Sequence, residues 1–142
     1  MNTTQTKTQT AQRIYPAIRY QNAKAAIAWL TSVLGFEAHE VCPGEGESIA
    51  HAELKLGGNL IMLGSVKPDA YGRSPKDLGG ATGSIYIALD TPAEINARYA
   101  RAKAAGAEIV RELEDTDYES REFGVRDPEG HAWSFGTYRP QP

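Results

Sequence analysis

The sequence contains few of the residues that cross-link a chain or bind metals in clusters. Its 142 residues include one cysteine and three histidines. A single cysteine excludes an intramolecular disulfide and a thiolate metal cluster, and no apolar run approaches the length of a membrane span. Lysine and arginine total 15 against 18 aspartates and glutamates, so there is no basic excess for nucleic acid. These absences disfavour nucleic-acid-binding and membrane-spanning proteins and favour a globular one.

The first twelve residues differ in composition from the rest. They are polar, of low complexity, and lack the apolar segment of a signal peptide. We therefore expect residues 1–12 to form a disordered tail, and we expect a cytoplasmic protein. The remaining chain is long enough for one domain with a hydrophobic core, which we place at 13–140.

A strand–helix–strand–strand–strand pattern occupies the first half of this domain. The helix is expected to begin at Asn22, a favourable N-cap residue, and to end at Gly35 in the left-handed conformation. Gly57 and Gly58 suit a primed hairpin turn between the last two strands. The four strands are expected at 14–20, 36–41, 48–56 and 59–64.

The same pattern follows in the second half. Thr91 as N-cap, Pro92 at the first helical position and Glu94 three residues after the cap predict the start of a second helix. The segment Asp127-Pro128-Glu129-Gly130 has the composition of a tight turn and joins the last two strands. The strands are expected at 84–90, 107–113, 121–127 and 131–138.

The repeat predicts an α+β protein built from two βαβββ modules, 13–65 and 83–140. Their strands are expected to form a curled mixed sheet with a central cleft and with the helices outside. The alternative is a ferredoxin-like α+β domain with an extra hairpin. The linker, 66–82, is rich in glycine and proline and is interpreted as a lid, a dimer contact or a plain surface connection.

Strand alternation divides the side chains between a face that packs on the helices and an open face. The open face collects polar and aromatic side chains, whose mixture is typical of a small-molecule pocket. Its members are Tyr15, Arg19, His51, Glu53, Met62, Ser84, Tyr86 and Ser134.

Three segments carry a resemblance to a known family: "AIRYQNAKAAIAWLTSVLGFE", "HAELKLGGNLIMLG" and "DPEGHAWSFGTY". Together with the βαβββ pair they are similar to the glyoxalase/bleomycin-resistance/extradiol-dioxygenase superfamily, the vicinal oxygen chelate proteins. The resemblance spans 14–138 and implies the fold. It also implies that the acidic loop 112–122 borders the pocket, which makes Tyr118 and Arg121 candidate ligand contacts, and that the protein forms a homodimer.

Metal-dependent members of that superfamily place His, Glu or Gln on four strands of the open face. The matching positions here are Tyr15, Met62, Ser84 and Ser134. None is a usual ligand of a divalent metal, and their neighbours in the sequence are no better. The resemblance therefore implies a protein without the usual metal site, similar to the metal-free, bleomycin-resistance branch, and we expect no cofactor.

His51 and Glu53 share a face because they are two residues apart on one strand. They are interpreted either as half of a non-standard metal site or as polar wall residues, with Glu53 paired to Arg19 across the sheet and His51 hydrogen-bonded. Cys42 precedes a predicted loop, and no histidine is fixed beside it by spacing. The sequence therefore gives little support to a nucleophilic cysteine.

Two functions from different classes follow. The first is a metal-independent protein that binds a small molecule and sequesters a drug or toxic metabolite. The second is a lyase or isomerase acting on a small oxygenated substrate. In it Glu53 is the general base and Arg19 stabilises negative charge, with Tyr15 or His51 as proton donor, or else His51 and Glu53 ligate a metal.

Overall fold

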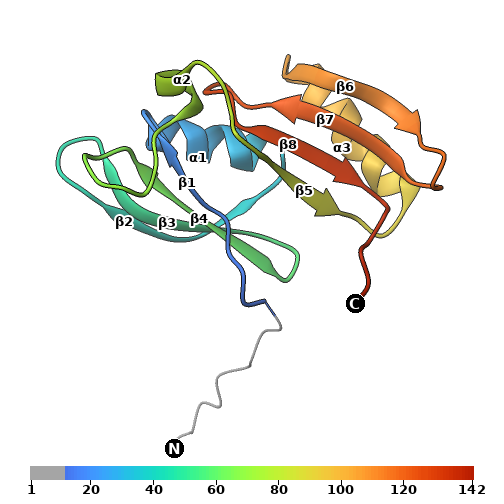
Figure 1. Cartoon of the computed structure of the whole chain (residues 1–142), viewed down its shortest axis with the longest axis horizontal. Coiled ribbons are helices and arrows are strands. Elements are labelled where there is room, and N and C mark those ends of the chain that lie inside the picture. The colour runs from blue at the N-terminus through green and yellow to red at the C-terminus, as the bar shows by residue number, and fades with distance from the viewer. Residues whose placement is uncertain (1–11) are drawn as a thin grey trace, which may run out of the picture.

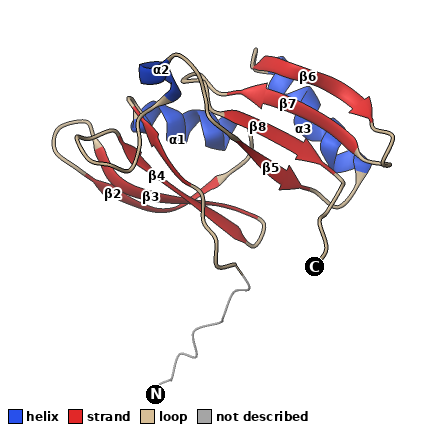
Figure 2. Cartoon of the chain, in the orientation of Figure 1, coloured by secondary structure: helices blue, strands red, loops and turns tan. Residues whose placement is uncertain are grey.

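The computed structural model describes residues 12–142 and shows two four-stranded sheets, each with a helix on one face (Figures 1 and 2). The elements are β1 (Ala17–Tyr20), α1 (Ala23–Ser32), β2 (Glu37–Pro43), β3 (Ile49–Leu56), β4 (Asn59–Ser65), α2 (Pro75–Leu78), β5 (Ser84–Ala88), α3 (Pro92–Ala104), β6 (Glu108–Asp115), β7 (Arg121–Arg126) and β8 (Ala132–Gly136). The α+β class is confirmed. Residues 1–11, most of the expected tail, lie outside the described part.

Strand order is β1-β4-β3-β2 in the first sheet and β5-β8-β7-β6 in the second. Within each sheet the first strand runs parallel to the last strand of its module, and the other pairings are antiparallel. We call β1–β4 with α1 module one, and β5–β8 with α3 module two. The strands thus form two separate sheets in place of the single curled sheet expected from the sequence, although each module has the predicted βαβββ order.

The predicted helix boundaries follow from local chemistry. The Asn22 side chain accepts a hydrogen bond from the Ala25 N–H at 3.0 Å, and Gly35 has φ of 83° just beyond α1. Thr91 and Glu94 form a reciprocal capping box at the start of α3. In the linker, Ser74 and Asp77 form a second capping box that supports the short helix α2, which the sequence analysis did not predict.

The two modules share one hydrophobic core on their helix sides. Leu30 of α1 and Phe36 belong to the same buried cluster as Phe123 and Trp133 of module two, and the Phe36 and Trp133 rings meet edge to face at 5.6 Å. At the surface, Arg101 of α3 donates to the carbonyls that end α1, a favourable place for a cation. The helix sides therefore hold the modules together.

A buried carboxylate, Asp127, connects the modules from the turn between β7 and β8. It is 3% exposed, and its Oδ2 accepts bonds from the Tyr20 hydroxyl at 2.6 Å and the Trp133 Nε1–H at 3.0 Å. Its Oδ1 accepts from the backbone N–H groups of Glu129 and His131, both at 3.0 Å. Burial, and then the Asp127 charge, raise the pKa of Tyr20 far above its ordinary value, so the phenol keeps its proton and remains a donor.

The next acidic residue of the same turn, Glu129, holds the start of α1. Its carboxylate accepts from the N–H groups of Gln21 and Asn22 at 2.7 and 2.8 Å, and from the Ser74 hydroxyl at 2.6 Å. A negative charge at a helix N-terminus is favourable. One turn of module two is thereby bonded to β1, α1 and the linker.

No helix in residues 12–142 is long and apolar enough to cross a membrane. Gln12, which the sequence analysis placed in the tail, exchanges two side-chain hydrogen bonds with the backbone of Leu60 in β4.

Replacing Asp127 by alanine is expected to lower the free energy of unfolding by about 3 kcal/mol or more. The change leaves the buried donors of Tyr20 and Trp133 without an acceptor. Chemical denaturation followed by tryptophan fluorescence measures the effect. The control is Asp117→Ala in the exposed turn before β7, which should change stability by no more than about 0.5 kcal/mol. Equal, small effects of the two changes would show that Asp127 does not couple the modules.

Candidate functional site

The open face of module one presents a polar row on neighbouring strands. Glu53 of β3 lies opposite Met62 of β4, and Met62 lies beside Ala17 of β1. Glu40 of β2 lies opposite Glu53 on the outer side. Met62 and Glu53 are half-buried, whereas the intervening Leu54 and Leu63 are fully or almost fully buried against the helix side. The predicted division of β3 and β4 between two faces is therefore confirmed.

The ion pairs on this face differ from those predicted. Arg19 binds Asp69 of the linker, with Nη2 to Oδ2 at 3.1 Å, and Glu53 binds His51, with Oε2 to Nε2 at 2.9 Å. The predicted Arg19–Glu53 pair is wrong, because the linker folds back and supplies a carboxylate that β1 alone could not reveal. A hydrogen bond from the Tyr71 N–H, and then one from Arg19, lower the pKa of Asp69.

The open face of module two contains a buried carboxylate that the sequence analysis missed. Glu122 of β7 is 3% exposed, and its Oε1 accepts from Arg111 Nη1 at 2.7 Å and from the Tyr118 hydroxyl at 2.9 Å. The alternation of Glu122, Gly124 and Arg126 along β7 could have identified this carboxylate from the sequence. The predicted open-face residues of β5 and β8, Tyr86 and Ser134, are direct partners in the register.

Three tyrosines surround Glu122 at the end of this face. Tyr86 donates its hydroxyl to the Tyr138 carbonyl at 2.6 Å, and the rings of Tyr118 and Tyr138 meet edge to face at 5.8 Å. All three side chains are exposed. Partial loss of water around the Tyr86 hydroxyl is the main cause that raises the pKa of Tyr86, so its phenol stays neutral. Gly136 makes room for Tyr86, because a Cβ at that position would meet the Tyr86 hydroxyl and would lie 2.8 Å from Glu122 Cγ.

Two of the predicted ligand contacts are directed elsewhere. Arg121 bonds Asn96 of α3 at 2.6 Å and Asp115 at 2.9 Å, on the opposite side of β7 from Glu122. Tyr15, just before β1, donates its hydroxyl to the Gln12 carbonyl at 3.2 Å. Tyr118, in contrast, lies over the open face of module two through its bond to Glu122.

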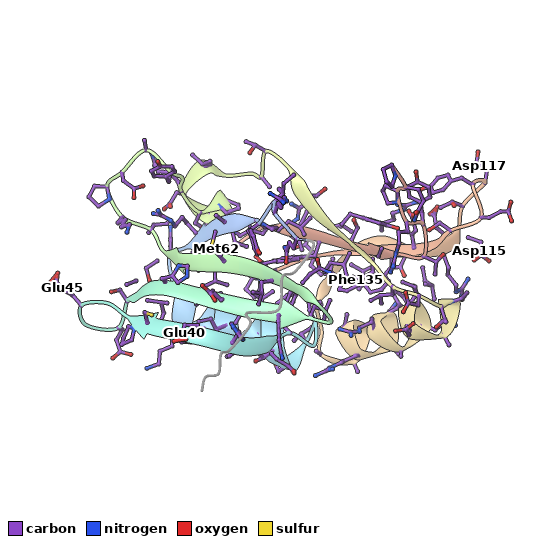
Figure 3. All side chains as sticks on the ribbon, turned by 90° about the horizontal axis from the view of Figure 1, so that it is seen from below. Glu40, Glu45, Met62, Asp115, Asp117 and Phe135 are labelled. Atoms are coloured by element: carbon purple, nitrogen blue, oxygen red, sulfur yellow. The ribbon has the colours of Figure 1, made fainter. Side chains whose placement is uncertain are left out.

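The open faces of the two modules do not face each other within one chain. In Figure 3 the sheet of module one is seen face-on with α1 behind it, whereas the sheet of module two is seen closer to its edge with α3 beneath it. The predicted residues therefore fall into two groups. Arg19, His51, Glu53 and Met62 lie on module one, and Ser84, Tyr86, Tyr118 and Ser134 lie on module two.

Two hollows lie where the modules meet. One, of about 720 Å³, is lined by Phe36, Leu60, Ile87, Tyr86 and Arg98, among others. The second, of about 430 Å³, is lined by Tyr15, Ser84 and His131 and by part of the linker. The predicted residues Tyr86, Tyr15 and Ser84 thus border space between the modules, while the His51–Glu53 pair and Ser134 border neither hollow.

The donor set of the described residues does not fit the superfamily's usual metal. Tyr15, Met62, Ser84 and Ser134 supply at most one marginal ligand. Within residues 12–142, no three side chains from His, Cys, Asp and Glu come close enough together to hold a metal ion. His51 and Glu53 lack the third protein ligand that even a catalytic zinc site requires.

Comparison with known proteins identifies the family. A sequence model of the Glyoxalase/Bleomycin resistance protein/Dioxygenase superfamily matches residues 13–135. The chain belongs to this superfamily. An uncharacterized protein of Mycobacterium bovis is 34% identical over 126 residues, which are 85% of this chain and 80% of the relative. An uncharacterized protein of Mycobacterium tuberculosis has the same identity over 71% of its own length.

Solved structures agree with this membership. TioX from Micromonospora sp. ML1 is 29% identical, with a TM-score of 0.69 over 91% of this chain and all of that one. The fosfomycin resistance protein FosX from Listeria monocytogenes, in complex with Mn(II) and sulfate, is 15% identical with a TM-score of 0.65 over 92% of this chain and 95% of that one. The second likeness concerns the fold alone. Because the superfamily includes resistance proteins and enzymes, the function depends on the site residues.

Proposed function

We propose that the protein binds a small molecule without a metal and acts by sequestering a drug or a toxic metabolite. The observation that carries the proposal is the chemistry of the open faces. The four positions that the resemblance matches to metal ligands hold Tyr, Met and two Ser residues, while neighbouring positions hold exposed tyrosines and half-buried polar groups. Such a mixture supports binding through apolar contact and a few oriented hydrogen bonds.

The expected ligand is aromatic and carries a positive charge. Tyr86, Tyr118 and Tyr138 offer aromatic surface to which a flat ring can stack, and an aromatic face also attracts a cation. Glu53 and the acidic loop before β7 add negative charge. A cytoplasmic location accords with this role and remains a prediction.

The homodimer expected from the resemblance supplies a reason for two outward-facing sheets. In one chain each polar open face lacks an opposing wall, whereas a second copy can place its module two against module one of the first. A ligand would then lie between the His51–Glu53 side of one chain and the Tyr86–Tyr118 side of the other.

Titration with aromatic cations and with glycopeptide drugs tests the binding proposal. We expect saturable binding in protein that contains less than about 0.1 equivalent of zinc, manganese, iron or nickel by elemental analysis. Tyr86→Ala should weaken binding about fivefold, because it removes a stacking surface worth on the order of 1 kcal/mol. The control, Tyr71→Ala, removes an exposed tyrosine of the linker and should bind as the unchanged protein does. Stoichiometric metal, or no saturable binding across the panel, would contradict the proposal.

The His51–Glu53 pair favours a second candidate function, the lyase or isomerase. A carboxylate bonded at 2.9 Å to an accessible imidazole can move a proton to or from a small oxygenated substrate. Arg19 is held by Asp69 in this structure, so stabilisation of negative charge by Arg19 would require it to leave that partner.

For this enzyme, Glu53→Gln should reduce turnover at least about 100-fold, because the amide cannot accept the proton. The rate of disappearance of an oxygenated substrate, followed by NMR, measures the effect. Asp69→Asn, which frees Arg19 and leaves Glu53 intact, serves as the comparison. Full turnover in the Glu53→Gln protein would exclude the general-base role.

Sedimentation velocity tests the assembly. We expect a dimer at micromolar concentration, and we expect Tyr118→Glu to shift it toward the monomer, because the added charge lies on a face that the dimer covers. Glu119→Gln, in the same turn, is the control. A monomer at every concentration up to about 100 μM would refute the shared site.

A further inference from the structure

Cys42, His51 and Glu53 come together on one face of module one. Strand β2 extends through Cys42 to Pro43, and the register places Cys42 directly opposite His51. Residues directly opposite in an antiparallel pair point to the same face, with Cβ atoms about 4.5–5.5 Å apart. His51 in turn lies 2.9 Å from Glu53, through Nε2 and Oε2. The sequence analysis ended this strand at residue 41 and found no histidine beside Cys42 from spacing, whereas the observed register supplies His51 as its neighbour.

The order of these groups is that of an assisted thiol: nucleophile, base and orienting carboxylate. An ionised carboxylate only accepts hydrogen bonds, so Nε2 of His51 carries the proton in the bond to Glu53. Nδ1 then holds the free lone pair of the ring. The Cys42 side chain is exposed on an outer strand and can rotate about χ1 toward the imidazole across the strand pair.

The surroundings leave the thiol accessible. Cys42 is exposed, and β2 is an outer strand of its sheet. The side chains of His51 and Glu53 are 43% and 31% exposed, so a small molecule can approach all three. Metal binding by this trio is not supported, since no group of three His, Cys, Asp or Glu side chains among residues 12–142 could hold a metal ion.

We propose that Cys42 is a reactive thiol, with His51 as its base and Glu53 as the residue that orients His51, and that it captures small α,β-unsaturated carbonyl compounds. His51 Nδ1 takes the thiol proton, and the sulfur forms a bond to the β-carbon of the acceptor. The electrons of the carbon–carbon double bond move onto the carbonyl as an enolate. The imidazolium returns its proton to the α-carbon, which leaves a thioether and neutral His51.

This inference goes beyond reversible binding and does not depend on it. Covalent capture can occur in a protein that binds no aromatic cation, and reversible binding can occur in a protein whose thiol is unreactive. The mass of the chain reports the first and a titration reports the second, so either proposal can fail alone.

The rate of reaction with N-ethylmaleimide, followed by intact-protein mass spectrometry, tests the proposal. Because Cys42 is the only cysteine, each chain should gain one adduct. At pH 7 we expect a second-order rate about tenfold above that of glutathione, with a weaker dependence on pH than the steady rise of an unassisted thiol.

Substitutions of His51 and Glu53 distinguish the role of the base from the role of the orienting carboxylate. His51→Gln should reduce the rate to within about twofold of glutathione and restore the steady rise with pH. Glu53→Gln should give an intermediate rate with a shifted pH profile. The matched control is His39→Gln, an exposed histidine of the same strand as Cys42, which should react as the unchanged protein does. Circular dichroism confirms that each variant is folded. A rate no faster than glutathione, or a rate that His51→Gln leaves unchanged, would overturn the proposal.

Discussion

The carboxylate of Asp127 is the interaction on which the arrangement of the two modules depends. It accepts four hydrogen bonds in a nearly water-free place, two from side chains of different modules and two from its own turn. A buried charge is tolerated only when its lone pairs are satisfied. The turn, Tyr20 and Trp133 must therefore adopt one mutual geometry, and Glu129 extends the constraint to the start of α1. The direction in which each open face points follows from this contact.

The packing of the two helix sides against each other determines which side chains remain on the open faces. The apolar residues of both modules are used in the common core, so the open faces keep the polar and aromatic side chains. Within the described part of the chain, neither open face is covered by a second surface. In the proposed homodimer, association would close the space in front of each open face. The chemistry of the two faces differs: module one is acidic with a histidine and a thiol, and module two is aromatic with a carboxylate paired to Arg111.

Much of the fold could be predicted because its determinants are local. The N-caps at Asn22 and Thr91 and the turn at Gly130 each depend on residues within four positions, and strand alternation placed Met62, Tyr86 and Ser134 on the expected face. The ion pairs could not be predicted in the same way. The partner of Arg19 is Asp69, fifty residues away on a linker without a periodic pattern, and the neighbour of Cys42 is set by register across an irregular strand with bulges.

The proposed metal-free site depends on the residues at the positions that the resemblance matches to metal ligands. Here Ser134 and Ser84 are small and polar, Gly136 leaves room for Tyr86, and Glu122 accepts bonds from Arg111 and Tyr118. Their joint presence is expected where the face contacts a ligand, and the same reasoning applies to the exposed Cys42–His51–Glu53 row, which contributes nothing to the core.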